Sequence, residues 1–176
     1  MQAPDLQISQ WFNTEGDLSL DDLKGKVVMI EAFQMLCPGC VSHGIHLAQA
    51  VQRTFSEDQV AVIGLHSVFE HHAAMTPVSL AAFLHEYRIT FPVGVDAPGT
   101  GHLPKTMEAY QLRGTPSLLL IDKFGKLRAH HFGDVSQLLL GAELAGLLAE
   151  THADQSPGAG LADTAGTNGD KSGCRV

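Results

Sequence analysis

The sequence has few basic residues, few cysteines and no long apolar run. Its 176 residues include 11 Lys and Arg against 19 Asp and Glu, a formal net charge of −8. Nucleic-acid-binding proteins cluster Lys and Arg against phosphates, so we expect no nucleic-acid partner. The longest apolar runs have the length of a strand, whereas a membrane-spanning helix needs about 20 residues. We therefore expect no membrane partner either.

A secretory signal combines a basic segment with an apolar one, and residues 1–10 do not show that pattern. We therefore expect a soluble, cytoplasmic protein. The sequence contains three cysteines, and a reducing compartment disfavours permanent structural disulfides. A catalytic or metal-binding role is then favoured for a pair of cysteines.

Composition divides the chain near residue 150. Residues 151–176 contain five glycines and only two large aliphatic residues, Leu161 and Val176. Such a segment cannot bury enough apolar surface to offset its conformational entropy, so we predict a globular domain over 1–150 and a disordered tail over 151–176. Cys174 lies in this tail. Closing so long a loop costs entropy, which favours an idle thiol over an additional resolving thiol.

Strand-length apolar runs alternate with helical patterns in residues 1–150. Residues 26–33 and 60–68 are nearly continuous apolar runs, typical of strands covered on both faces. Between them, apolar residues recur every three or four positions, which predicts a helix that begins near Val41 and a β-α-β unit. The other predicted elements are a helix capped by Thr76, a strand over 91–96, a short helix over 105–110, a hairpin of strands 117–122 and 127–132, and a helix over 135–149. This order predicts an α/β fold with a mixed central sheet and helices on both faces.

The sequence Cys-Pro-Gly-Cys at residues 37–40 stands between the first buried strand and its helix. A thiol at a helix N-terminus faces unpaired N–H groups and the positive end of the dipole, which lower its pKa. We therefore predict that Cys37 is an exposed attacking thiolate and that Cys40 is the resolving thiol. His43 is expected on the helix surface, where a partial positive charge would assist Cys37.

Zinc binding is an alternative for this pair, because His43 and His46 follow Cys40 at steps of three residues. Residues six apart on a helix are poorly aligned, so these three side chains do not easily share one metal. His71 and His72 follow the second strand and could bind metal or shape a groove, although a solvated loop is the simpler interpretation. We predict no metal site and keep a zinc-binding or interaction module as an alternative.

Several motifs resemble the thioredoxin superfamily, and those near the start resemble its redoxin branch, the AhpC/TSA and TlpA-like proteins. They are Ala3-Pro4-Asp5, Leu20 to Val28, Cys37-Pro38-Gly39-Cys40, Arg113-Gly114-Thr115-Pro116-Ser117, Phe124-Gly125-Lys126 and Gly133. The resemblance covers about residues 1–150. It implies a thioredoxin fold with an N-terminal redoxin-type extension, and dithiol chemistry.

The resemblance also implies roles for single residues. Pro116 matches the family's cis-proline, which would turn the Thr115 backbone toward an incoming peptide for strand-like pairing. With Pro38 and Gly39, these residues form the expected substrate-binding set. Glu31 matches an acidic residue that lies behind the second cysteine, which suggests a proton acceptor for Cys40. Alternation along a strand does not decide its face, so an outward-pointing Glu31 stays an alternative.

The predicted function is a thiol–disulfide oxidoreductase that works as a disulfide reductase without a bound cofactor. Its expected partners are a disulfide-containing protein or small thiol substrate and a recycling reductant. A peroxiredoxin-like thiol peroxidase that uses Cys37 is an alternative. Peroxiredoxins have Thr or Ser three residues before the reactive cysteine, where this chain has Gln34, and they need a distant Arg, for which Arg113 is a candidate.

Overall fold

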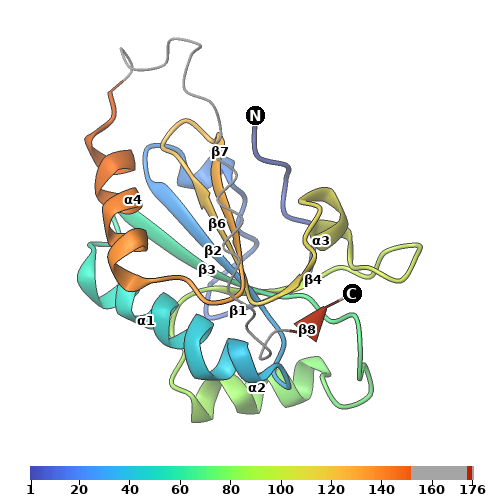
Figure 1. Cartoon of the computed structure of the whole chain (residues 1–176). Coiled ribbons are helices and arrows are strands. Elements are labelled where there is room, and N and C mark those ends of the chain that lie inside the picture. Colours follow the sequence, from blue (N-terminus) through green and yellow to red (C-terminus); the bar gives the residue numbers. More distant parts are fainter. Residues whose placement is uncertain (152–173, 176) are drawn as a thin grey trace.

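A central mixed sheet sets the position of the other elements. The computed structural model describes residues 1–151 and 174–175. Six strands pair in the order β1-β4-β3-β2-β6-β7 (Figure 1). Their bounds are β1 Ile8–Phe12, β2 Val27–Phe33, β3 Val60–His66, β4 Val93–Asp96, β6 Ser117–Ile121 and β7 Leu127–Phe132. β2, β3 and β4 are parallel, whereas β1 pairs with β4, and β6 with β2 and β7, in antiparallel fashion.

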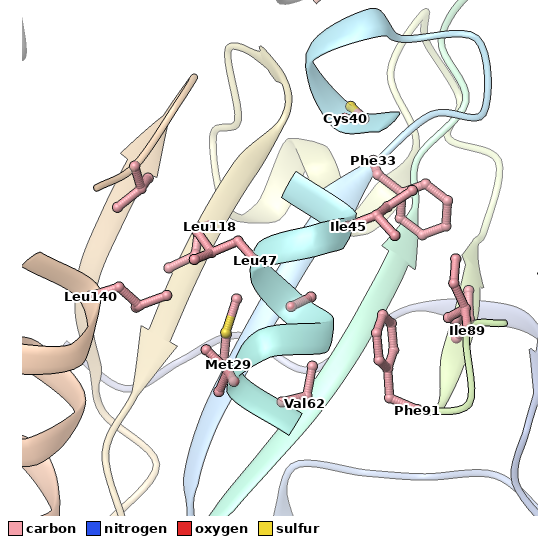
Figure 2. Close-up of a cluster of buried hydrophobic side chains, with 14 of the residues drawn as sticks. Met29, Phe33, Cys40, Ile45, Leu47, Val62, Ile89, Phe91, Leu118 and Leu140 are labelled. Atoms are coloured by element: carbon pink, nitrogen blue, oxygen red, sulfur yellow. The ribbon is translucent and has the colours of Figure 1, made fainter. Parts of the chain in front are cut away.

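Helices cover both faces of this sheet. Side chains of α1 (Ile45–Thr54), α2 (Pro77–Glu86) and α4 (Gln137–Ala149) join one apolar cluster, and those of the 3-10 helix η1 (Asp21–Leu23) and α3 (Lys105–Ala109) join another. Alternation along β2 separates the clusters, because Met29 and Phe33 face α1 whereas Ile30 and Ala32 face the other side. Figure 2 shows the first cluster, with Cys40 at its upper edge.

The predicted α/β fold with helices on both faces is confirmed. The Thr76 cap is also confirmed, because Thr76 Oγ1 accepts a hydrogen bond from the Ser79 N–H at 3.3 Å. The predicted helix after the cysteine pair begins as one π-helical turn, η2 (Cys40–Gly44), and continues as α1. No strand was predicted before residue 26, yet β1 extends the sheet beside β4. It is only half-buried, so it lacks the apolar run that identified the inner strands.

A second, two-stranded sheet joins distant parts of the sequence. β5 (Gly114–Thr115) pairs in antiparallel fashion with β8 (Cys174–Arg175), drawn in red in Figure 1. Most of the predicted tail, residues 152–173 and 176, lies outside the described residues, but Cys174 and Arg175 depart from the expectation of disorder. Backbone pairing and apolar contacts of Cys174 offset the entropy of loop closure that argued against this placement. The described helices include none long and apolar enough to cross a membrane.

Candidate active site

The chain between β2 and α1 positions both cysteines. After β2 ends at Phe33, the N–H of Cys37 donates to the carbonyl of Gln34 at 3.2 Å, which closes a turn. The N–H of Val41 then donates to the Cys37 carbonyl at 3.1 Å, which starts the helical segment. Pro38 stands in the first turn, where its missing N–H costs nothing. Cys37 therefore lies at a helix N-terminus, as the sequence predicts.

The sulfur of Cys37 is held by polar groups on two sides. It accepts a hydrogen bond from the Cys40 N–H at 3.3 Å, and its thiol form donates to the Thr115 carbonyl at 3.4 Å. Hydrogen bonds from the Cys40 thiol, and then from the N–H groups of Cys40 and Cys174, lower the pKa of Cys37 to about 5 although burial opposes them. Cys37 is therefore a thiolate at neutral pH.

The expectation that Cys37 is exposed is wrong, because its exposed fraction is 0%. The Thr115 loop and the backbone of Cys174 both contact its sulfur. Sequence reasoning placed Cys37 correctly on the helix but did not anticipate the strand that covers it. The exposed neighbour is Leu36, with an exposed fraction of 56%.

Cys40 is buried and its acidity is shifted in the opposite direction. Burial first, and then the hydrogen bond to Cys37 and the charge of Cys37, raise the pKa of Cys40. It therefore stays protonated while Cys37 carries the charge. Two thiols with these opposite properties suit a nucleophile and a resolving thiol.

Glu31 lies inside the protein, on the face of β2 that α1 covers. Its exposed fraction is 1%, so the alternative of an outward-pointing side chain is wrong. A Cβ atom at Gly44 would lie 2.1 Å from Glu31 Oε1 and 3.3 Å from the Cβ of Pro116, so glycine leaves the room for this carboxyl group. Burial first, and then the charge of Cys37, raise the pKa of Glu31. Among the described residues its Oε1 has no hydrogen-bond partner.

The structure brings the predicted Thr115–Pro116 segment against the thiols. The peptide bond between these two residues is cis, both are buried, and Thr115 contacts Cys37. Pro38 is exposed and Gly39 is buried within the helical turn. Substrate binding by these four residues stays a prediction.

Gln34 and Glu70 were not predicted as parts of the site. Gln34 is fully buried, its Oε1 accepts from the Phe69 N–H at 3.2 Å, and its Nε2 donates to Glu70 Oε1 at 3.4 Å. Gln34 thus fixes the loop after β3 beside the cysteine turn. The available signal was a polar residue directly after a buried strand, where an unpaired amide would be costly.

The histidines near the cysteines do not lie where the zinc hypothesis requires them. His43 and His46 are exposed, and His43 Nδ1 is hydrogen-bonded to Ser42 Oγ at 2.7 Å. His71 and His72 are exposed as well. Within residues 1–151 and 174–175, no group of three or more His, Cys, Asp or Glu side chains could hold a metal ion.

Comparison with known protein families identifies the family of this chain. Residues 1–130 match the AhpC/TSA family. The chain belongs to the AhpC/TSA family. It is similar to a solved thioredoxin-like superfamily protein, with 74% identity, a TM-score of 0.85, and coverage of 86% of this chain and 98% of the other. A solved thiol-disulfide isomerase from Corynebacterium glutamicum is 53% identical, with a TM-score of 0.81 and coverage of 85% and 98%.

Curated relatives are longer proteins. Protein DipZ of Mycobacterium bovis is 31% identical over 138 residues, which is 75% of this chain but 18% of that protein. The chain therefore spans less than a fifth of the length of this relative. The thioredoxin fold and the redoxin branch expected from the motifs are confirmed, and so is the general class of thiol–disulfide oxidoreductase enzymes.

Proposed function

We propose that this protein is a disulfide reductase that uses Cys37 and Cys40 as a dithiol. The observation that carries the proposal is the pair of contacting thiols whose pKa values are shifted in opposite directions, lowered to about 5 for Cys37 and raised for Cys40. A thiolate is the form that attacks a disulfide. The neighbouring Cys40 thiol stays protonated, and does not react, until the mixed disulfide has formed.

The first step is attack by the Cys37 thiolate on one sulfur of a substrate disulfide. A bond forms between Cys37 Sγ and that sulfur, the substrate S–S bond breaks, and the other sulfur leaves as a thiolate that takes a proton from solvent. The β5 edge at Thr115 would pair with the backbone of an extended substrate. Leu36, apolar and exposed beside Cys37, offers a contact for a protein substrate.

The second step releases the reduced substrate. Cys40 attacks Cys37 Sγ, the mixed disulfide breaks, and the Cys37–Cys40 disulfide forms. The charge of Cys37 contributes to the raised pKa of Glu31. That charge is absent while Cys37 is bonded to substrate, so the pKa of Glu31 falls at the moment when Cys40 must lose its proton. Glu31 therefore releases its own proton more readily and can accept the proton of Cys40 as a carboxylate at this step.

The expected partners are a disulfide-containing protein or small molecule and a reductant that recycles the pair. The mechanism uses no bound cofactor. The cytoplasmic location stays a prediction, which fractionation of cells that express the protein at its native level would test.

The peroxidase alternative has less support in the geometry. The Gln34 amide is engaged by Phe69 and Glu70, and Arg113 places its guanidinium 5.4 Å from the centroid of the Phe132 ring. Neither side chain therefore supplies the hydroxyl or the free guanidinium that a peroxide site of this branch needs. Peroxide consumption by a Cys40→Ser variant in excess thiol would nevertheless favour the peroxidase.

The midpoint potential of the dithiol tests the reductase. We would equilibrate Cys174→Ser protein in glutathione or dithiothreitol buffers and quantify the Cys37–Cys40 disulfide. A two-electron couple at or below about −240 mV supports a reductase, whereas a value near about −150 mV indicates an oxidant or isomerase. A protein that forms no reversible disulfide between these cysteines overturns the dithiol mechanism. Cys37→Ser is the matched control, because it keeps Cys40 and removes the nucleophile.

A further inference from the structure

β8 lies on the strand edge beside the cis-proline. Gly114 pairs with Arg175 and Thr115 pairs with Cys174 in antiparallel register. Gly114 permits this approach, because a Cβ at that position would lie 2.1 Å from the Cys174 carbonyl oxygen and 3.0 Å from Arg175 Cα. The Arg175 guanidinium adds a contact, 5.7 Å from the centroid of the Phe132 ring. An extended segment of this chain thus occupies the edge that the proposed function assigns to substrate.

The side chain of Cys174 meets the reactive thiol. Cys174 pairs with Thr115, whose carbonyl oxygen lies 3.4 Å from Cys37 Sγ. The backbone N–H of Cys174 contributes to the lowered pKa of Cys37, and Cys37 and Glu70 both raise the pKa of the Cys174 thiol, so these groups lie within interaction distance of one another. Glu70 is itself held by Gln34 Nε2 at 3.4 Å. Cys174 is a free thiol that lies partly buried between the two apolar clusters. A third sulfur, a proton acceptor and a fixed backbone register therefore come together at Cys37.

We propose that Cys174 is a third redox-active thiol of this site, which takes the position of a substrate cysteine and forms a reversible intramolecular disulfide with Cys37. This inference rests on the proposed function, because the exchange starts from the oxidised Cys37–Cys40 pair.

The exchange is balanced within the protein. Cys174 Sγ attacks Cys37 Sγ and gives its proton to Glu70, the Cys37–Cys40 bond breaks, and Cys40 leaves and takes a proton from Glu31. One disulfide is replaced by another, so no external oxidant or reductant is consumed. Burial, the charge of Cys37 and hydrogen bonds to Glu70 and Cys37 raise the pKa of Cys174 to about 12 in the reduced protein. The charge of Cys37 is absent in the oxidised pair, which lowers that pKa when attack occurs.

Disulfide mapping of the full chain is the first test. Trypsin cleavage after Lys26, Arg53, Lys171 and Arg175 puts Cys37 and Cys40 on one peptide and Cys174 on another. Wild-type protein equilibrated with glutathione, acid-quenched and alkylated should yield the linked peptides 27–53 and 172–175, with Cys40 alkylated. Their amount relative to the Cys37–Cys40 form should not depend on protein concentration. Cys174-linked dimers that grow with protein concentration would contradict an intramolecular bond.

A Cys40→Ser variant isolates the new disulfide. At about 0.1 mM glutathione, we expect the Cys37–Cys174 form to exceed the glutathione adduct of Cys37 by about tenfold or more, because a tethered thiol has a millimolar or higher effective concentration. The matched control is Cys40→Ser with Cys174→Ser and Arg175→Cys. Moving the thiol by one residue turns it to the other face of β8, so the adduct should then predominate.

Two failures are distinguishable. If Cys174→Ser protein forms Cys37–Cys40 normally but Cys40→Ser protein gives only the glutathione adduct, the inference on Cys174 is wrong and the reductase stands. If Cys174→Ser protein forms no Cys37–Cys40 disulfide, the proposed function itself fails.

Discussion

Cys37 and Cys40 carry the same side chain three residues apart, yet their surroundings favour different protonation states. N–H groups and the Cys40 thiol stabilise negative charge on Cys37, whereas Cys40 lies deeper and faces that charge. Only one of two adjacent thiols ionises readily, because the negative charge of the first thiolate disfavours ionisation of the second thiol. The choice of nucleophile is therefore decided by the hydrogen bond that Cys37 accepts from the Cys40 thiol, by the N–H groups near Cys37 and by the deeper burial of Cys40.

This difference predicts the pH dependence of alkylation. In reduced Cys174→Ser protein, the rate of Cys37 alkylation by iodoacetamide should follow a single titration near pH 5, the value to which hydrogen bonds lower the pKa of Cys37. Removing the Cys40 thiol with Cys40→Ala should move the midpoint upward, because the largest stabilising hydrogen bond is lost. A midpoint near about 8.5 in the parent protein would show an ordinary thiol and contradict the assignment.

His66 predicts a second pH effect, on stability. Burial lowers the pKa of His66 to about 4, and both ring nitrogens lack hydrogen-bond partners among the described residues. The unfolded chain has a histidine pKa of about 6.5, so it binds a proton between pH 6.5 and 4 that the folded protein does not. The free energy of unfolding therefore decreases as pH falls through this window.

His66→Leu should remove this pH dependence of the free energy of unfolding. We expect its free energy of unfolding, relative to that of wild type, to be about 2 kcal/mol larger at pH 5 than at pH 8, as measured by urea denaturation. His43→Leu is the control, because His43 is exposed. An equal effect of His66→Leu at both pH values would mean that His66 is protonated in the folded protein.

Among the elements, the π-helical turn η2 depends on a glycine. A Cβ at Gly44 would collide with the buried carboxyl group of Glu31. Gly44→Ala should lower the free energy of unfolding by about 1–3 kcal/mol, the usual cost of overpacking. The loss should shrink when Glu31→Ala removes the carboxyl group, and a double-mutant cycle measures that coupling.

Gly141 supplies the matched control for this experiment. It also lies in a helix, α4, but no atom lies within 4 Å of the position of an added Cβ. Gly141→Ala should therefore raise the free energy of unfolding by about 0.5–1 kcal/mol through helix propensity. If both alanine variants stabilise the protein, Glu31 does not fill the space under η2.

α3 depends on a single carboxylate at the end of β4. Asp96 accepts hydrogen bonds from the N–H groups of Thr106 and Met107 at 2.8 and 2.9 Å, and from Ser67 Oγ at 2.9 Å. Asp96→Ala leaves these donors unpaired inside the protein, so we expect a loss of about 2–3 kcal/mol in the free energy of unfolding. Urea denaturation measures this loss, and Asp21→Ala on the exposed η1 should cost much less. A loss as small as that of Asp21→Ala would show that Asp96 does not hold α3.

At the scale of the whole molecule, local patterns predicted most of the architecture. The β-α-β unit, the Thr76 cap and the hairpin after β6 follow from periodicity and turn residues within short windows. The site was predictable where a motif or a family position names a residue, as for Cys37 and Pro116. β1 and β8 were not, because both are short, partly exposed strands that form through pairing with distant residues. Burial of Cys37 was missed for the same reason, since a residue 137 positions later contributes to it.

The acidity of one thiol also predicts how the whole fold responds to oxidation. A thiolate with a lowered pKa stabilises the reduced fold above about pH 5, and this stabilisation is lost as pH falls through that value. In the oxidised protein Cys37 has no proton to lose, so its contribution does not change with pH. The difference in free energy of unfolding, reduced minus oxidised, should therefore increase between pH 5 and pH 7, by about 1–2 kcal/mol.

Guanidinium denaturation of reduced and oxidised Cys174→Ser protein at the two pH values measures this difference. Stabilising the reduced form makes the disulfide easier to reduce, so the midpoint potential must rise by about 20–40 mV relative to an unperturbed dithiol, and a reductase requires that the raised potential still lie at or below about −240 mV. Stability and potential are then two measurements of one free energy, and they must agree. A difference that stays constant between pH 5 and pH 7 would mean that Cys37 is not a thiolate in the reduced fold, and the nucleophile would have to be assigned elsewhere.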